Sequence, residues 1–405
     1  MKPSPTVVSL FSGAGGLDVG LERAGWDTVF ATDIDPAAVA SLRESQGARV
    51  RVAGSPVRRH LESARIVQAD VCELRAADVR PPGCKPSWRP SLLAGGPPCQ
   101  PWSSGGLQRG FNDARGLLIG QMLRLADELK PRFVMMENVR GLLTAVGPKG
   151  QHGEAIRVIH SEWERLGYAV SWAILNAADF GAAQRRVRLV MLGTADHTLP
   201  SFPEPTHDRD GRQGRHPWVA LGDLLARRPP PDPCDIDEPT GVRAKEVLKL
   251  KPGTGLRTGG VVEHQRPGGH WGYRQDSFLA DLSLPSRTIR AAGTPDWVRP
   301  VGERMRRLTW RECAALQGFP EEWSLGENKT VRFRLIGNAV QTDMAEAVGR
   351  SLMAALLLGE SKTTPRSACW PGYFDRRITG AAADHRANAA TRSRHHERTQ
   401  QGTLF

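Results

Sequence analysis

The start of the chain restricts the fold more than any other stretch. Thr6–Phe11 is a short, apolar and β-branched run, which is typical of a buried strand. It ends at the glycine turn Ser12-Gly13-Ala14-Gly15-Gly16, and from Leu17 to Ala24 apolar residues recur at helical spacing. A strand, a glycine turn and a helix in this order begin a βαβ unit of the nucleotide-binding type.

The glycine turn also indicates the kind of ligand. Glycine has no Cβ, so a ligand can approach the backbone closely, although the same turn can serve helix packing alone. The spacing differs from the G-x-G-x-x-G dinucleotide motif, and no G-x-x-x-x-G-K-[ST] phosphate loop is present. We therefore predict a small ligand that is recognised by shape and hydrogen bonds, without a pyrophosphate group.

Further strands and helices alternate along the first half of the chain. The predicted strands are Thr28–Thr32, Ile66–Gln68, Ser91–Ala94, Phe133–Met136, Ala169–Leu175 and Arg188–Gly193. The predicted helices are Leu117–Leu129, Ala155–Leu166 and, near the end, Ala345–Leu358, and the arginine-rich residues 43–65 are expected to form a solvated helix or an insertion. This alternation predicts a doubly wound α/β domain over residues 1–195.

Four acidic or reactive side chains follow predicted strands. Asp33, Asp70, Cys99 and Glu137 each come just past the carboxyl end of a strand. Ligands of open α/β sheets bind at this edge, and an acidic residue after the second strand usually holds a ribose. Asp33 is the better placed for that role, whereas Asp35 either shares it or caps the next helix.

Cys99 stands in the stretch Gly95–Ser103, directly after Pro97 and Pro98. The two prolines fix φ and remove two backbone donors, which predicts a rigid extended turn. A sulfur atom held in this way suits a nucleophile, although an isolated cysteine is more often a small buried core residue. The six cysteines are far apart and include no C-x-x-C pair, so we expect neither a metal site nor disulfides.

The charge of the chain points to a polyanionic partner. The formal net charge is +12 and the sequence pI about 9.9, a balance that is commonest in proteins that bind nucleic acid. The tail 361–405 carries eight Lys and Arg against three Asp and Glu, so most of the excess lies in the body of the protein. We expect this tail to be disordered because it has few core-forming residues.

Residues 196–285 differ in composition from the segment before them. They are rich in Pro, Gly, Arg and Asp, with isolated aromatic residues such as Trp218 and Tyr273. The segment is too long for one surface loop, which predicts a loop-rich second domain. Interleaved arginines and aromatic residues suit contacts in a nucleic-acid groove; the alternative is a purely structural insertion.

The chain shows no signal for a membrane. Its N-terminus lacks a basic-then-apolar pattern, and no apolar run approaches the ~18 residues of a membrane span. We therefore expect a cytoplasmic protein with no membrane partner. We also expect a monomer, which the nucleic-acid binding expected from its charge would associate with the nucleoid.

Eight segments, in order along residues 6–345, carry a specific resemblance. They are Phe11-Ser12-Gly13-Ala14-Gly15-Gly16, Asp33, Asp70, Pro98-Cys99-Gln100-Pro101-Trp102-Ser103, Glu137-Asn138-Val139, Gln184 with Arg186 and Arg188, Leu316-Gln317-Gly318-Phe319-Pro320, and Gly337-Asn338-Ala339-Val340. In this order they resemble the cytosine-C5 DNA methyltransferases of bacterial restriction-modification systems. The resemblance implies a Rossmann-like catalytic domain over 1–195, a smaller target-recognition domain over 196–325, a returning segment over 326–360 and an extra basic tail over 361–405.

The resemblance also implies a covalent reaction on cytosine. The Cys99 thiolate would add to C6, and a protonated Glu137 would neutralise the charge that develops at N3. Arg186 and Arg188 would hold the cytosine carbonyl, and Arg185, which alternates with them, is expected to face away. The base that removes the C5 proton is not identified by the sequence, and a water molecule is one candidate.

The implied methyl donor is S-adenosylmethionine, with no metal. The implied cofactor-binding residues are Phe11 beside the adenine, Gly13, Gly15 and Gly16 around the methionine part, Asp33 at the ribose, Asp70 at the adenine amine and Asn338 as a completing or bracing residue. The chemistry cannot proceed inside a duplex, so the target base in double-stranded DNA should be flipped out. Gly105–Arg115 would then form the closing loop, and residues 196–285 would read the flanking sequence.

Two departures from the family and two alternative functions complete the expectations. Gln341 stands where many relatives have proline or a small apolar residue, and Asp33 stands where glutamate is frequent.

A tRNA cytosine methyltransferase is one alternative function, but the Cys-Phe-Thr motif of such relatives is absent. The other is a catalytically silent DNA-binding relative, against which the intact Cys99, Glu137 and Arg186 argue. We expect a restriction-modification role, in which a cognate endonuclease would be a functional partner.

Overall fold

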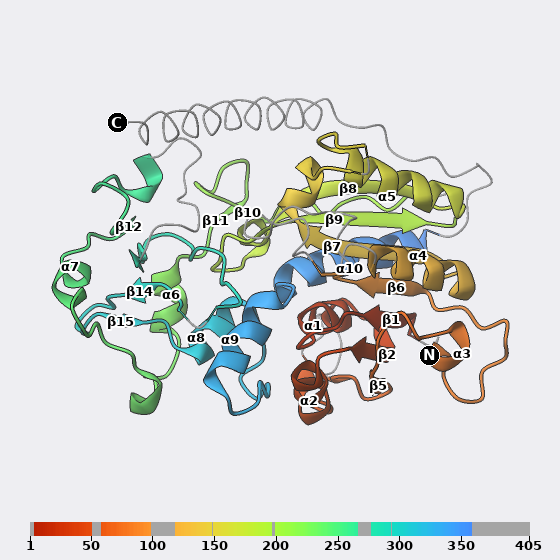
Figure 1. Ribbon diagram of the computed structural model, residues 1–405, viewed down its shortest axis with the longest axis horizontal. Helices are drawn as coiled ribbons and strands as arrows, with labels where there is room; N and C mark the ends of the chain where they lie inside the picture. Colours follow the sequence, from red (N-terminus) through yellow and green to blue (C-terminus); the bar gives the residue numbers. More distant parts are fainter. Residues whose placement is uncertain are drawn as a thin grey trace, which may run out of the picture.

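The computed structural model describes residues 4–50, 58–98, 118–147, 149–196, 199–265, 277–292 and 294–358. Cys99, the expected closing loop Gly105–Arg115 and the tail 361–405 lie outside these residues. Two lobes make up the described part, a large sheet covered by helices and a smaller, loop-rich lobe (Figure 1).

A seven-stranded sheet with the order β5-β2-β1-β6-β7-β9-β8 forms the first lobe. Its strands are β1 (Thr6–Leu10), β2 (Asp27–Asp33), β5 (Arg65–Gln68), β6 (Leu92–Gly95), β7 (Phe133–Val139), β8 (Ala169–Asn176) and β9 (Val187–Thr194). The pairs from β5 to β7 are parallel, whereas β9 runs antiparallel to both β7 and β8. The predicted strands are all present, most with ends shifted by one to three residues. The described part of residues 43–65 holds the end of a helix and two short antiparallel strands, which agrees with the insertion that the sequence left open and not with a solvated helix.

Helices cover both faces of this sheet, as a doubly wound fold requires. They are α1 (Gly16–Arg23), α2 (Pro36–Glu44), α3 (Ala76–Val79), α4 (Leu118–Leu129), α5 (Glu154–Arg165) and α10 (Thr342–Leu357). Successive strand residues point to opposite faces, so Val134 packs in a core with α4 and α5, whereas Phe133 packs in a second core with α1 and α10. The hydrophobic runs predicted as strands are therefore buried on both sides.

The contact between α1 and α10 is close because glycine stands at its centre. A Cβ on Gly20 would lie 2.6 Å from the carbonyl oxygen of Thr342 and 2.8 Å from the backbone nitrogen of Glu346, and would also meet the Ala345 side chain. These backbone atoms cannot move without displacing the whole of α10.

Gly20→Ala should therefore destabilise the protein by about 1–3 kcal/mol, because the overpacking outweighs the better helix propensity of alanine. Urea unfolding monitored by circular dichroism measures this loss. Gly120→Ala in α4 is the matched control, since a Cβ there meets no described atom within 4 Å, and it should leave stability unchanged or slightly higher. Equal stabilities for the two variants would contradict the prediction.

The second lobe is built on a small four-stranded sheet with the order β12-β13-β14-β15. Its strands are β12 (Thr254–Gly255), β13 (Phe278–Leu279), β14 (Trp297–Val298) and β15 (Arg306–Arg307), and its helices are α6 (Leu221–Ala226), α7 (Ala244–Leu248), α8 (Trp310–Leu316) and α9 (Lys329–Asn338). The remaining short strands are β3 (Arg49–Val50), β4 (Arg58–Arg59), β10 (His207–Asp208) and β11 (His216–Pro217). Residues of α8 and α9 share a core with Ala14 and Val19, which joins this lobe to the glycine turn and to α1.

The chain returns from the second lobe by pairing with the residues just before β9. Ser286 donates its N–H to the carbonyl of Ala183 (2.8 Å), and Arg185 donates its N–H to the carbonyl of Ser286 (2.8 Å). Within the described ranges, no helix is long and apolar enough to cross a membrane.

Candidate active site

Glu137 lies inside β7 and not beyond its end, which corrects the strand boundary predicted at Met136. The strand is longer because β9 runs antiparallel beside it and pairs Glu137 with Val190 and Val139 with Arg188. The ladder thus gives hydrogen-bond partners to residues that were expected to be loop. Asp33, in turn, is the last residue of β2, so it also belongs to its strand.

The Glu137 and Arg188 side chains form an ion pair at the carboxyl edge of the sheet. The Arg188 Nε atom lies 3.0 Å from Glu137 Oε1, and the two side chains are 11% and 10% exposed. Their strands neighbour each other, so the backbone ladder holds the pair in register. A carboxyl group and a guanidinium are therefore held together in a largely dehydrated position, where electrostatic interactions are stronger than in water.

The turn that leads towards Cys99 lies directly against this pair. A Cβ on Gly96 would stand 3.4 Å from Glu137 Oε2, so the backbone of the turn passes close to the carboxyl group. Asn138, which is fully buried, donates from Nδ2 to the carbonyl of Pro97 (3.2 Å). The structure thus places Glu137 next to Gly96-Pro97-Pro98, and Cys99 is the next residue in the sequence.

Arg186 is placed differently from Arg188. Only 2% of it is exposed, and its Nη2 atom donates to the carbonyls of Gly337 (2.9 Å) and Ala339 (2.8 Å). Its Nη1 atom donates to the carbonyl of Ile289 (3.1 Å). The guanidinium therefore ties the start of β9 to the returning segment, and a direct contact with a base stays a prediction.

Gln184 and Gln317 complete the same junction. The Gln184 side chain accepts from the Ile289 N–H (3.0 Å) and donates to the carbonyl of Leu316 (3.0 Å). The Gln317 Nε2 atom donates to the carbonyl of Ile336 (2.5 Å). Both amides are fully buried, and their hydrogen bonds join the start of β9 to the returning segment.

The Asp33 carboxylate organises the glycine turn. It accepts from the N–H of Gly13 (2.8 Å) and from the N–H of Asp35 (2.9 Å). Burial raises the pKa of this carboxyl group. Asp35 caps α2 through the N–H of Ala37 (3.0 Å) and forms an ion pair with Arg334, so the capping alternative is the one that the structure shows.

The three glycines of the turn serve two different purposes. Gly13 has φ +55°, and a Cβ on it would meet no described atom within 4 Å, so open space lies beside it. A Cβ on Gly15 would collide with the side chains of Leu42 and Trp323, and one on Gly16 would strike the carbonyl oxygen of Val340. Gly13 thus fits a ligand cradle, whereas Gly15 and Gly16 allow close packing.

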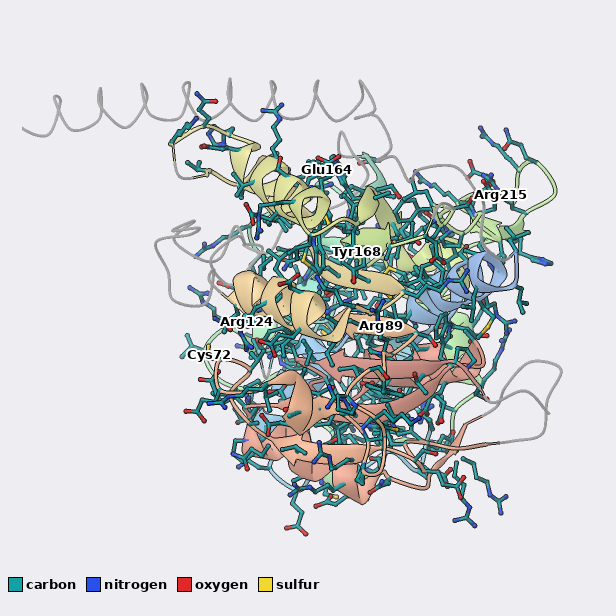
Figure 2. All side chains as sticks on the ribbon, turned by 90° about the vertical axis from the view of Figure 1, so that its right-hand side faces the viewer. Cys72, Arg89, Arg124, Glu164, Tyr168 and Arg215 are labelled. Atoms are coloured by element: carbon teal, nitrogen blue, oxygen red, sulfur yellow. The ribbon has the colours of Figure 1, made fainter. Side chains whose placement is uncertain are left out.

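Phe11 and Asp70 flank the same edge. Phe11 has φ +54°, a rare backbone conformation for a bulky side chain, and its Cδ2 atom would lie 3.4 Å from a Cβ on Gly95. Asp70 is partly buried and accepts from the Cys72 N–H (2.9 Å). Arg124 of α4 donates to the neighbouring Val71 carbonyl (3.0 Å) and lies beside the exposed Cys72 (Figure 2).

Asn338 ends α9 and is exposed. The residues that follow it pack on α1, since a Cβ on Gly16 would meet Ala339 as well as Val340. Asn338 therefore stands next to the residues that pack on the glycine turn, and its role in completing a cofactor pocket stays a prediction. The departure Gln341 caps α10, because its side chain accepts from the Met344 N–H (2.9 Å).

A comparison with protein families decides what this arrangement is. The model of the family described as "C-5 cytosine-specific DNA methylase" matches residues 5–354. The chain belongs to this family. It is thus an S-adenosylmethionine-dependent DNA cytosine methyltransferase, as its sequence motifs predict.

Individual relatives agree with this methyltransferase assignment. Type II methyltransferase M.NgoFVII of Neisseria gonorrhoeae is 31% identical over 361 residues, which cover 86% of this chain and 86% of the relative. Type II methyltransferase M.NaeI of Lentzea aerocolonigenes is 32% identical over 362 residues, with coverages of 86% and 75%. The solved structures of Spodoptera frugiperda DNMT2 (TM-score 0.58, 15% identity, coverages 86% and 100%) and S. pombe Dnmt2 (TM-score 0.56, 19% identity, coverages 88% and 98%) confirm the predicted α/β fold.

Three residues that the sequence analysis did not assign help to build the site of this methyltransferase. Asn138 holds Pro97, as described above. Trp323 donates from its indole N–H to the carbonyl of Ala14 (2.9 Å), and Arg23 donates to the carbonyl of Gly318 (2.8 Å). Asn138 stands inside a recognised motif, which was an available signal, whereas Trp323 and Arg23 stand outside the motifs.

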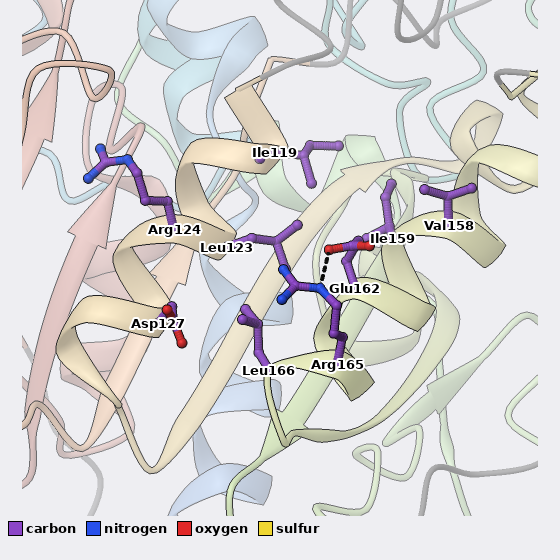
Figure 3. A pocket seen from close by; sticks show the side chains of 10 residues that line it. Ile119, Leu123, Arg124, Asp127, Val158, Ile159, Glu162, Arg165 and Leu166 are labelled. Carbon is purple, nitrogen blue, oxygen red and sulfur yellow. Dashed lines mark hydrogen bonds and ion pairs between the residues drawn. The ribbon is translucent and has the colours of Figure 1, made fainter.

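A hollow between α4 and α5 is separate from the site. Its volume is about 390 Å³, and its lining includes Ile119, Leu123, Ile159 and Leu166. Arg165 and Glu162 form an exposed ion pair (2.9 Å) at its rim (Figure 3). None of the predicted site residues that the structure describes lines this hollow.

Asp18, in the first turn of α1, is fully buried behind the glycine turn. Burial raises its pKa to about 6. The folded state then binds a proton more tightly than the unfolded state, so the free energy of unfolding should fall as pH rises from about 4 to about 6. The loss should be about 3 kcal/mol at pH 7.

Asp18→Asn should remove this fall. The free energy of unfolding of the variant, relative to that of the parent protein, should therefore increase as pH rises. Chemical unfolding at a series of pH values tests the difference between the two proteins. Asp127→Asn on the exposed side of α4 is the control and should leave the profile unchanged. An Asp18→Asn profile that runs parallel to the parent profile would argue against the prediction.

Proposed function

We propose that this enzyme methylates C5 of a cytosine that is flipped out of double-stranded DNA, through a covalent bond between Cys99 and C6. The observation that carries the proposal is the ion pair at the carboxyl edge of the sheet, in which Arg188 Nε lies 3.0 Å from Glu137 Oε1. The turn Gly96-Pro97-Pro98 passes beside this pair and leads into Cys99. A nucleophile, a proton donor and a fixed positive charge are the three groups that attack on a cytosine ring needs.

The residues would act in the following order. Glu137 first takes up a proton from solvent. The Cys99 thiolate then adds to C6, and the electrons of the C5–C6 double bond make C5 nucleophilic while Glu137 delivers this proton to N3. When bound, S-adenosylmethionine would supply the methyl group that C5 takes up, and its sulfonium would leave as the neutral thioether S-adenosylhomocysteine. A base, for which a water is a candidate, then removes the C5 proton. The C6–S bond breaks, Glu137 recovers its proton, and the double bond is restored.

Arg188 has two tasks in this scheme. It stays beside Glu137 throughout, and it faces the position of the cytosine carbonyl, where negative charge develops. Arg186 would act through position, because its printed hydrogen bonds go to the carbonyls of Ile289, Gly337 and Ala339. We thus assign Arg188 to the base and Arg186 to the frame that supports it.

The cofactor would lie along the other half of the edge. Open space beside Gly13 and the partly buried acids Asp33 and Asp70 fit the methionine, ribose and adenine parts of S-adenosylmethionine. Phe11 would flank the adenine, and Asn338 would stand at the rim. Gly15 and Gly16 support this site indirectly, since their contacts are with protein atoms.

The smaller lobe would read the DNA sequence. We assign target recognition to residues 196–325, the return to the catalytic domain to residues 326–360, and additional DNA contacts to the excess positive charge. Relatives of similar length bear the name Type II methyltransferase, which supports a role beside a restriction endonuclease.

Bisulfite sequencing of DNA from cells that express the enzyme tests the function directly. We expect protected cytosines in one sequence context, and no protection in cells that express Cys99→Ala. Complete conversion of all cytosines in the presence of folded enzyme would refute the proposal. Methyl transfer to RNA in place of DNA would favour the alternative of a tRNA methyltransferase.

A further inference from the structure

We propose that Arg185 and Glu263 are positioning residues that couple target recognition to the base pocket. This inference rests on the proposed function, because it assigns recognition to the smaller lobe. Its basis is an ion pair between the lobes: Arg185 Nη2 lies 2.7 Å from Glu263 Oε2, and the two side chains are 14% and 2% exposed.

Arg185 stands two residues before β9 begins and three before Arg188. The run from Gln184 to Arg188 thus sends its side chains to different parts of the protein. Arg186 reaches the returning segment, Arg188 reaches Glu137, and Arg185 reaches the smaller lobe. The sequence predicts that Arg185 faces away from the pocket, and in the structure its side chain pairs with a buried partner and does not face solvent.

Glu263 is anchored in the smaller lobe by the backbone. Its N–H donates to the carbonyl of Gly253 (2.9 Å), and the N–H of Gly253 donates to the carbonyl of Leu279 (2.9 Å) in β13. The carboxylate thus moves with the small sheet of β12 and β13. Any shift of this sheet on DNA binding would therefore displace the Arg185 side chain through its ion pair with Glu263.

The ion pair is an unusual choice if stability alone is required. Burying two charges costs solvation free energy that their attraction recovers only in part, and apolar replacements are often as stable. The backbone already joins the lobes here, because Ser286 pairs with Ala183 and Arg185, and Thr288 donates to the Arg185 carbonyl (2.8 Å). We therefore infer that the ion pair fixes the orientation of the two lobes, whose connection is already provided by these backbone hydrogen bonds.

The two ion pairs are connected by a very short path. From Glu263 the path runs through Arg185, along three residues of backbone to Arg188, and across to Glu137. The β7–β9 ladder keeps this backbone rigid at Arg188. Binding of the smaller lobe to the correct DNA sequence would thus bring the Arg188 guanidinium into its active position. Binding to an incorrect DNA sequence would leave the guanidinium displaced.

The test compares methylation of two duplexes, one with the site found by bisulfite sequencing and one with a single altered base pair beside the target cytosine. Arg185→Gln and Glu263→Gln should each lower the ratio of the two kcat/KM values by about tenfold, as expected for contacting charged groups. The double variant should lose no more than either single variant. Arg185→Glu combined with Glu263→Arg should recover part of the ratio, and KM for S-adenosylmethionine should stay unchanged.

Arg165→Gln is the matched control, since it removes an exposed Arg–Glu pair on α5 and should not alter the ratio. If Arg185→Gln does not fold, Arg185→Lys keeps the charge without the planar fork and should still lower the ratio more than twofold. A purely structural pair would lower both rates together and leave the ratio unchanged, and additive losses in the double variant would also refute the coupling. An inactive parent enzyme would instead refute the proposed function.

Discussion

Cys99→Ala is expected to lower the rate of methyl transfer by about 10⁴-fold or more, because no other group in the proposed scheme can form the bond to C6. DNA binding should change little, since the phosphate contacts that dominate affinity do not involve this sulfur. A tritiated-methyl assay under single-turnover conditions measures the first quantity, and fluorescence anisotropy with a labelled duplex measures the second.

The chain offers a matched control in Cys72, which is exposed near the same edge of the sheet. Cys72→Ala should transfer methyl groups at the parental rate. Trapping provides a second check, because a duplex with 5-fluorocytosine at the target position should form a covalent complex with the parent enzyme and with Cys72→Ala only. Substantial turnover by folded Cys99→Ala would mean that another residue is the nucleophile.

Glu137→Gln should have the second largest effect, a loss of about 10²–10⁴-fold in kcat. Glutamine keeps the shape of the side chain but cannot deliver a proton to N3. It also leaves the Arg188 guanidinium without its charged partner at a position that is only 11% exposed. KM for S-adenosylmethionine should change less than kcat, because the carboxyl group is not among the proposed cofactor residues.

Glu162→Gln on α5 is the control for this substitution, since it removes a carboxylate from an exposed ion pair with Arg165. That variant should retain the parental kcat and stability. The prediction for Glu137 would be wrong if Glu137→Gln kept the parental kcat, or if its activity fell only in proportion to the fraction of protein that unfolds. Thermal unfolding of both variants separates these outcomes.

Most of the large sheet could be predicted because its strands are buried on both faces and therefore appear as uniform apolar runs. Phe133–Met136 is such a run, but the strand continues through Glu137 and Asn138, where the side chains are polar. Their inclusion depends on pairing with β9, which is distant in sequence. A prediction from local pattern ends such a strand where its apolar residues end.

The candidate site was predictable as a set of motifs, but not as a division of labour among them. Arg186 and Arg188 have the same chemistry and alternate in sequence, yet one binds backbone carbonyls and the other pairs with Glu137. Gly13 and Gly16 likewise differ only in what surrounds them. Such distinctions depend on segments that return from more than a hundred residues away, such as Gly337–Val340.

The pair of Arg185 and Glu263 could not be predicted for a related reason. Glu263 stands in a loop-rich segment without periodicity, so no sequence pattern marks it as buried. Its burial results from the small sheet of two-residue strands, which is too short to give a strand signal.

The packing of α10 on α1 has a consequence for how the enzyme folds during its synthesis. The helix beside the glycine turn is covered by α10, the last described element of the chain, and the Trp26 indole N–H donates to the carbonyl of Gly349. A ribosome must therefore release the chain through Leu357 before the packing around the glycine turn can be completed, although domains usually fold during synthesis. We expect chains that are cut or stalled before α10 to be inert.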